Sequence, residues 1–214
     1  VTADNGYITV TVSGKGLKDD YFKNQCSANV RMKISDGNNE KASEYIQMIP
    51  WTTDVISFAD ANFKAYLVEN FDTTGDGEIS AEEAEAVTEI SASMLNITST
   101  VGIEYFKNLE SVDLSYNKLT SIDLSHSQKL QTIDVCGNKI VDIKVDGLAK
   151  LETLDCSSNK IEALNISESK DLKTLNCNGN QIGSLVLNNN KELTELQCNN
   201  NNLTVLNLQN NTKL

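Results

Sequence analysis

A leucine recurs every 21 residues through the second half of the chain, and this period restricts the possible folds more than any other feature. The six positions are Leu109, Leu130, Leu151, Leu172, Leu193 and Leu214. Self-similarity at a fixed period of this length is typical of solenoids, in which each turn packs only on its neighbours and all turns share one core. The second half is therefore predicted to form a stack of regular turns.

Apolar residues follow each leucine at fixed distances and indicate two short extended segments in every unit. In the first unit Val112 and Leu114 stand three and five positions after Leu109. Because strand side chains alternate between two faces, both point into the core and the residues between them point outward. Stacked units then pair these strands into a parallel sheet. Residues 121–124 form a second extended segment, with Ile122 and Leu124 facing inward.

Two further positions of the unit carry polar atoms into or next to the core. An asparagine stands eight residues after each leucine, at Asn117, Asn138, Asn159, Asn180 and Asn201. A buried amide is tolerated only when it is hydrogen-bonded, so these side chains are predicted to bond the backbone of neighbouring turns. Cys156, Cys177 and Cys198 occupy core positions about 5 Å apart, the spacing of neighbouring strands. Buried thiols are the favoured interpretation and a disulfide the alternative.

These units resemble the leucine-rich repeats of bacterial surface proteins, the internalin type and its relatives in gut Bacteroidetes. The resemblance covers residues 96–214, because 96–106 matches a partial first turn. The core cysteine within residues 154–159 resembles the Bacteroidetes variety in particular. The resemblance implies an extracellular or cell-surface module that binds a ligand. The chain stops at Leu214, the first residue of another unit, so further repeats are expected to follow.

A solenoid must cover the open end of its first turn, and residues 54–95 are predicted to do so as a helical cap. Phe63, Leu67 and Phe71 lie at four-residue spacing, which gives one helix an apolar stripe. Ser80 and Glu83 form a capping box at the start of a second helix. The second helix is expected to face inward through Ala84, Val87 and Ile90.

Residues 72–83, between the two helices, match the EF-hand calcium loop. Such loops place oxygen ligands at alternate positions, a glycine at the sixth and a glutamate at the twelfth. Gly77 takes the sixth position, and Thr74 is a departure because Asp or Asn is usual there. The candidate calcium ligands are Asp72, Thr74, Asp76, Glu78 through its carbonyl, Ser80 and Glu83. A metal-free cap that retains the loop is the alternative.

Residues 1–53 carry the period-two alternation of strands at 7–13, and further strand patterns at 30–34 and 45–49. Residues 36–39 read Asp-Gly-Asn-Asn, a turn signal. This segment is interpreted as a small sheet or as part of a β-sandwich. The chain as a whole is therefore predicted to be α+β, with a β segment, a helical EF-hand-like cap and a solenoid of short parallel strands.

The outward strand positions form the candidate binding surface, on the concave face of the solenoid. Its candidate ligand-binding residues are Asp113, Tyr116, Asp134, Asp155, Asn176 and Gln197. Stacked aspartates repel by about 1 kcal/mol per pair in water, a cost that a bound cation or a basic partner offsets. Solvated carboxylates without a ligand are the simpler alternative. The expected ligand is a protein, less often a glycan, and a structural spacer is the rival function.

Charge and composition exclude several function classes. A net charge of −12 disfavours nucleic acid and anionic membranes as partners. No apolar run approaches the roughly 20 residues that span a bilayer. His126 is the single histidine and is predicted to lie away from Cys136, so no Cys–His pair forms. The chain is expected to be a monomer without enzymatic activity.

Overall fold

The computed structural model describes residues 55–214 and, before them, the backbone of six short strands. The chain divides into two units, Val1–Thr52 and Thr53–Leu214. In the first unit β1 (Thr2–Asp4) pairs with β2 (Tyr7–Thr9), β3 (Asn29–Val30) with β6 (Ile46–Gln47), and β4 (Lys33–Ser35) with β5 (Glu40–Ala42), all antiparallel. The predicted turn at 36–39 and the predicted strand residues 10–13 lie outside the described residues.

Two helices begin the second unit, and both start at the side-chain caps that their sequences contain. Helix α1 (Ala61–Phe71) begins where the Asp60 carboxylate accepts the N–H groups of Asn62 and Phe63, each at 2.9 Å. Helix α2 (Ala81–Ala86) begins at Ser80, whose hydroxyl and N–H exchange hydrogen bonds with Glu83. The predicted capping box is confirmed.

The second helix is shorter than its apolar pattern suggests. It ends at Ala86, and Ile90 lies in strand β7 (Glu89–Ser91), where Ile90 pairs in register with Val112. The prediction that Ile90 faces inward from the helix is therefore wrong. Parallel pairing with the next turn satisfies the backbone here and still buries Ile90 completely, so strand replaces helix.

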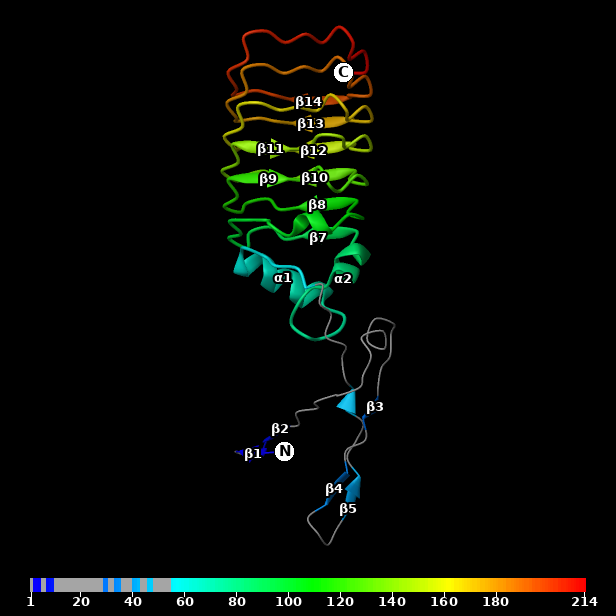
Figure 1. Cartoon of the computed structure of the whole chain (residues 1–214). Coiled ribbons are helices and arrows are strands. Elements are labelled where there is room, and N and C mark those ends of the chain that lie inside the picture. The colour runs from blue at the N-terminus through cyan, green and yellow to red at the C-terminus, as the bar shows by residue number, and fades with distance from the viewer. Residues whose placement is uncertain are drawn as a thin grey trace. The chain divides into compact units, whose positions relative to one another are not determined.

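The solenoid is built on a six-stranded parallel sheet in the order β14–β13–β12–β10–β8–β7. Its members after β7 are β8 (Ser111–Asp113), β10 (Thr132–Asp134), β12 (Thr153–Asp155), β13 (Thr174–Asn176) and β14 (Glu195–Gln197). From β8 onward each strand pairs with the residues 21 positions further on, as the period predicts, and the strands stack in one column in Figure 1.

A second, two-stranded parallel sheet lies beside the first. Strand β9 (Ser121–Asp123) pairs with β11 (Asp142–Lys144), again with a 21-residue register (Figure 1). In the first turn a 3-10 helix, Ile103–Tyr105, follows the corresponding segment. The leucines from Leu109 to Leu193 are fully buried, and together with the other apolar rows they form one continuous core.

The asparagines link each turn to the one before it. The Asn138 side chain accepts a hydrogen bond from the N–H of Leu119 and donates to the carbonyl oxygens of Leu114 and Val135. The same three kinds of bond recur at Asn117, Asn159, Asn180 and Asn201. The predicted bonding of the amides to neighbouring turns is confirmed.

The repeat cysteines are free thiols. Cys156 and Cys177 are buried and Cys198 is half-buried. Burial, together with the neighbouring Cys198, raises the pKa of Cys177 to about 12. These side chains therefore act as small apolar core residues at neutral pH, as the favoured interpretation held.

Candidate functional site

The outward-pointing side chains of β8, β10, β12, β13 and β14 form a single surface, which we call the sheet face. Asp113, Asp134, Asp155, Asn176 and Gln197 stand opposite one another in register across the five strands. The first four are half-buried and Gln197 is exposed. The predicted row is therefore brought together on one surface.

Each aspartate of the row uses one carboxylate oxygen to hold its own strand end. The Oδ1 atoms of Asp113, Asp134 and Asp155 each accept the N–H of the residue two positions further on, at 2.9 Å. Each carboxylate also has a neutral side-chain partner: the Ser115 hydroxyl donates to Asp113 at 2.6 Å, the Cys136 thiol bonds Asp134, and Asn176 donates to Asp155 Oδ2 at 2.8 Å. Among the described residues, none of the three carboxylates forms an ion pair. Unpaired negative charge is therefore concentrated along β8, β10 and β12.

Tyr116 lies at the end of this row and depends on a glycine in the next turn. Its backbone is left-handed, at φ 53°, and its side chain is 59% exposed. A Cβ atom on Gly137 would lie 2.7 Å from the Tyr116 ring, well inside van der Waals contact. The absence of a side chain at Gly137 therefore makes room for the ring.

Cys136, which the sequence analysis considers only as a partner for His126, is a neighbour of this row. One ligand atom each of Asp134, Cys136 and Asp155 lie within 4.8 Å of one another. Partial burial and the hydrogen-bonded Asp134 raise the pKa of the Cys136 thiol to about 12. A thiol that stays protonated at neutral pH is a poor nucleophile. The sequence could have predicted this cluster, because Cys136 shares a strand face with Asp134 and Asp155 lies 21 residues after Asp134.

The loop between α1 and α2 is held by its own acidic side chains. The Asp72 carboxylate accepts the N–H groups of Gly75 and Gly77, at 2.6 and 2.8 Å. Glu83 accepts the N–H groups of Thr73 and Ser80, at 2.8 and 2.9 Å. Gly77 has φ 80°, the left-handed conformation of a sharp turn. Burial raises the pKa values of Asp72 and Glu83, but these hydrogen bonds outweigh it and hold both below their usual range.

All six candidate calcium ligands therefore lie in this loop, but their carboxylate oxygen atoms do not converge on one point as they would around a bound ion. Within residues 55–214 the carboxylates of Asp72, Asp76 and Glu83 do not gather within 4.8 Å of one another. Both oxygens of Glu83 accept loop hydrogen bonds, and the hydroxyl of Ser80 also bonds Glu83 at 2.9 Å. The donor atoms suit calcium in type and number. Binding would require Glu83 to exchange its N–H partners for the ion.

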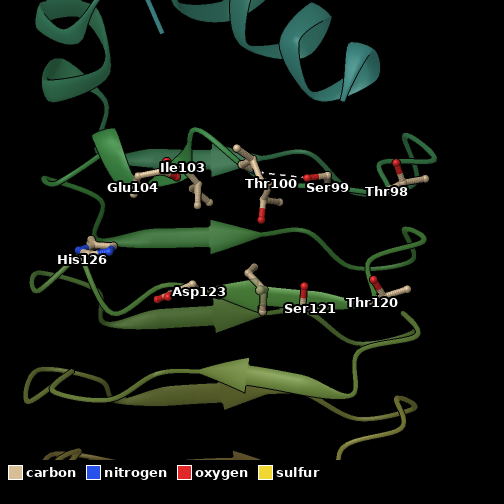
Figure 2. A pocket seen from close by; sticks show the side chains of 11 residues that line it. Thr98, Ser99, Thr100, Ile103, Glu104, Thr120, Ser121, Asp123 and His126 are labelled. Atoms are coloured by element: carbon tan, nitrogen blue, oxygen red, sulfur yellow. Dashed lines mark hydrogen bonds between the residues drawn. The ribbon is translucent and has the colours of Figure 1, made fainter. Parts of the chain in front are cut away.

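His126 lies on the turn after β9, whereas Cys136 lies after β10 on the sheet face. Figure 2 shows His126 beside Glu104 and Asp123, at the edge of a hollow in the first two turns. In the part of the chain that the structure describes, no helix is long and apolar enough to cross a membrane.

Comparisons with known proteins agree with this geometry. Residues 107–150 match the family model described as leucine-rich repeats (2 copies). An internalin, inlF, from Listeria monocytogenes is 26% identical, with a TM-score of 0.66 over 73% of this chain and 48% of that one. Internalin C2 from the same species is 25% identical, with a TM-score of 0.63 over 73% of this chain and 72% of that one.

The chain spans about half the length of the inlF structure. A search of curated proteins finds no significant match. The repeats and these two structures show an internalin-like leucine-rich-repeat fold.

Proposed function

We propose that this internalin-like leucine-rich-repeat protein is a non-catalytic module that binds a protein ligand through the sheet face, outside the cell or on the bacterial surface. The observation that supports it is the in-register row Asp113, Asp134 and Asp155, which has no ion-pair partner in residues 55–214. Electrostatic complementarity favours a partner with Lys or Arg side chains at strand spacing.

Tyr116 supports a protein ligand over a glycan. Exposed tyrosines beside charged residues are frequent centres of protein interfaces. A glycan platform needs several flat rings, and Tyr116 is the single aromatic side chain that we assign to the described sheet face. A structural spacer, the rival function, would need no such row.

Site-specific crosslinking tests the proposal. A photoreactive phenylalanine analogue replaces Tyr116, and in a control chain it replaces Val186, which is 61% exposed away from the sheet face. Each chain is exposed to proteins of the surface on which the source cells grow. We expect a protein crosslinked from position 116 and not from 186.

The captured protein is then titrated against the wild type and against Asp113→Asn/Asp134→Asn/Asp155→Asn. Asparagine keeps the Oδ1 acceptor, so the fold is retained while the charge is removed. Affinity is expected to fall roughly three- to 150-fold, since three ion pairs at about 0.2–1 kcal/mol each are lost. Equal crosslinking from positions 116 and 186, or unchanged affinity of the triple variant, would contradict binding through the sheet face and favour the spacer function.

We also propose that residues 72–83 bind calcium and thereby stiffen the cap. Supporting this are the oxygen donors at alternate positions and the left-handed Gly77. Calorimetric titration with CaCl2 tests it, with Asp76→Asn as the variant and exposed Asp142→Asn as the control. Among the described residues the Asp76 side chain bonds only the N–H of Glu78, and asparagine keeps that acceptor, so the loop structure is preserved. We expect saturable heat in the control and weaker calcium binding in Asp76→Asn, because asparagine keeps an oxygen ligand but removes one negative charge. No heat in the wild type would leave a metal-free cap.

A further inference from the structure

A hollow of about 520 Å³ lies between the first turn and strand β9, away from the sheet face. We call it the first-turn hollow. Its walls are residues 98–101 and 103–104 on one side and 120–123 and 126 on the other, as Figure 2 shows. This volume is within the range of pockets that bind small ligands or peptide segments, about 300–1,000 Å³.

Among the described residues, the segment 97–106 of the first turn is hydrogen-bonded to the next turn only at its two ends, which leaves the hollow between them. The N–H of Lys118 donates to the carbonyl oxygen of Ile97 at 2.8 Å, and the hydroxyl of Ser127 donates to that of Phe106 at 3.0 Å. Between these bonds, Thr98 donates twice to Asp60 at the start of α1, at 2.8 and 2.6 Å. The first turn is thus tied to the cap rather than to β9.

The consequence is an unpaired edge of β9. The carbonyl oxygen of Thr120 and the N–H of Leu124 bond the β11 side, each at 2.9 Å. Since successive residues of a strand direct their peptide groups to opposite edges, those of Ser121 and Asp123 face the hollow. Among the described residues, no backbone hydrogen bond joins these two residues to the first turn. Two donors and two acceptors at strand spacing are therefore available.

The walls of the hollow select for a basic ligand. Glu104 and Asp123 both line it, and the only cation within salt-bridge distance of either, among the described residues, is the exposed Lys144, at 3.4 Å from Asp123. Val101, which is 55% exposed, and the buried Ile103 and Ile122 add apolar surface. The lining contains no Phe, Tyr or Trp ring on which a sugar would stack.

We propose that the first-turn hollow binds a short extended peptide segment carrying Lys or Arg, which adds to the outer edge of β9. Main-chain bonds to Ser121 and Asp123 supply the pairing, as in other strand-addition complexes. Glu104 and Asp123 supply the preference for positive charge. This site is separate from the sheet face and does not depend on the function proposed for that surface.

Amide chemical shifts of the 15N-labelled full chain test this inference. The probe is a capped hexapeptide of alternating Lys and Val, with an alternating Glu and Val peptide as the charge control. A third peptide has the Lys–Val sequence with N-methyl groups on alternate amides, so it keeps the charge but cannot pair. We expect saturable shifts at Ser121 and Asp123 with the first peptide alone.

Two variants separate the hollow from the sheet face. Glu104→Gln is expected to weaken the Lys–Val peptide roughly two- to fivefold, the effect of one exposed ion pair. The triple asparagine variant of the sheet face should leave its affinity unchanged. Absence of saturable shifts at Ser121 and Asp123, equal shifts with the N-methylated peptide, or shifts there with a chitin oligosaccharide instead of the peptide would each overturn the proposal.

Discussion

Replacing Asn159 by alanine tests whether the asparagine row holds the turns together. Its side chain accepts the N–H of Ile140 at 2.9 Å and donates to the carbonyl oxygens of Val135 and Cys156 at 2.9 and 3.1 Å. Alanine removes all three bonds and leaves the buried Ile140 N–H without a partner, whereas the carbonyl oxygens of Val135 and Cys156 keep the side chains of Asn138 and Asn180 as donors. At about 1 kcal/mol net for each hydrogen bond, with a range of 0.5–1.5, the free energy of unfolding should fall by about 2–4 kcal/mol.

The assay is urea denaturation followed by circular dichroism, which gives the midpoint and the slope for each variant. Asn189→Ala is the matched control, because exposed Asn189 makes one surface bond, to the carbonyl oxygen of Ser167. Its loss should change stability by less than about 0.5 kcal/mol. Asn159→Asp keeps the acceptor, loses both donors and buries a charge, so it should destabilise as strongly as alanine. Equal, small effects of Asn159→Ala and Asn189→Ala would refute the reasoning.

Three further predictions follow from the cap and the sheet face. Burial raises the pKa values of Asp60 and Glu83, but hydrogen bonds outweigh it and hold them below the ordinary 3.8 and 4.5. The two ionised carboxylates therefore stabilise the folded protein fully above pH 4.5. This contribution is lost as the pH falls through their lowered pKa values in the folded protein. The melting temperature should drop on acidification in that range, less so in Asp60→Asn. Cys136 should react with a thiol reagent at pH 8 at least about tenfold more slowly than free cysteine, because its pKa is about 12. Gly137→Ala should destabilise by about 1–2 kcal/mol, through its positive φ and the Tyr116 ring, and Tyr116→Ala should restore part of the loss in a double-mutant cycle.

The repeating architecture could be predicted from local pattern alone. A 21-residue period, alternating apolar positions and a recurring asparagine leave little choice of fold, because each unit can bury its apolar face only against a copy of itself. The helix starts at Asp60 and Ser80 were also predictable, since capping depends on side chains within three residues of the helix end. The row from Asp113 to Gln197 follows from the same period.

The helix end was not predictable in the same way. The apolar spacing through Ile90 suits a helix as well as a strand, because Ile90 is buried in either. Residues 89–91 form a strand because they pair with the edge of β8, whose peptide groups would otherwise have no hydrogen-bond partners. That competition involves residues 22 positions apart, and a local pattern carries no information about it.

By itself, the sequence determined the turns, their period and which side chains face in or out, because these depend on spacing along the chain. Only the tertiary structure decided where the stack departs from that rule. The bond from Thr98 to Asp60 crosses 38 residues and ties the first turn to the cap, so β9 keeps an unpaired edge beside a hollow. Stacking likewise brings Asp155 of the following turn beside Cys136 and Asp134. Both arise from contacts between segments distant in sequence, whose energies depend on distances that no period specifies.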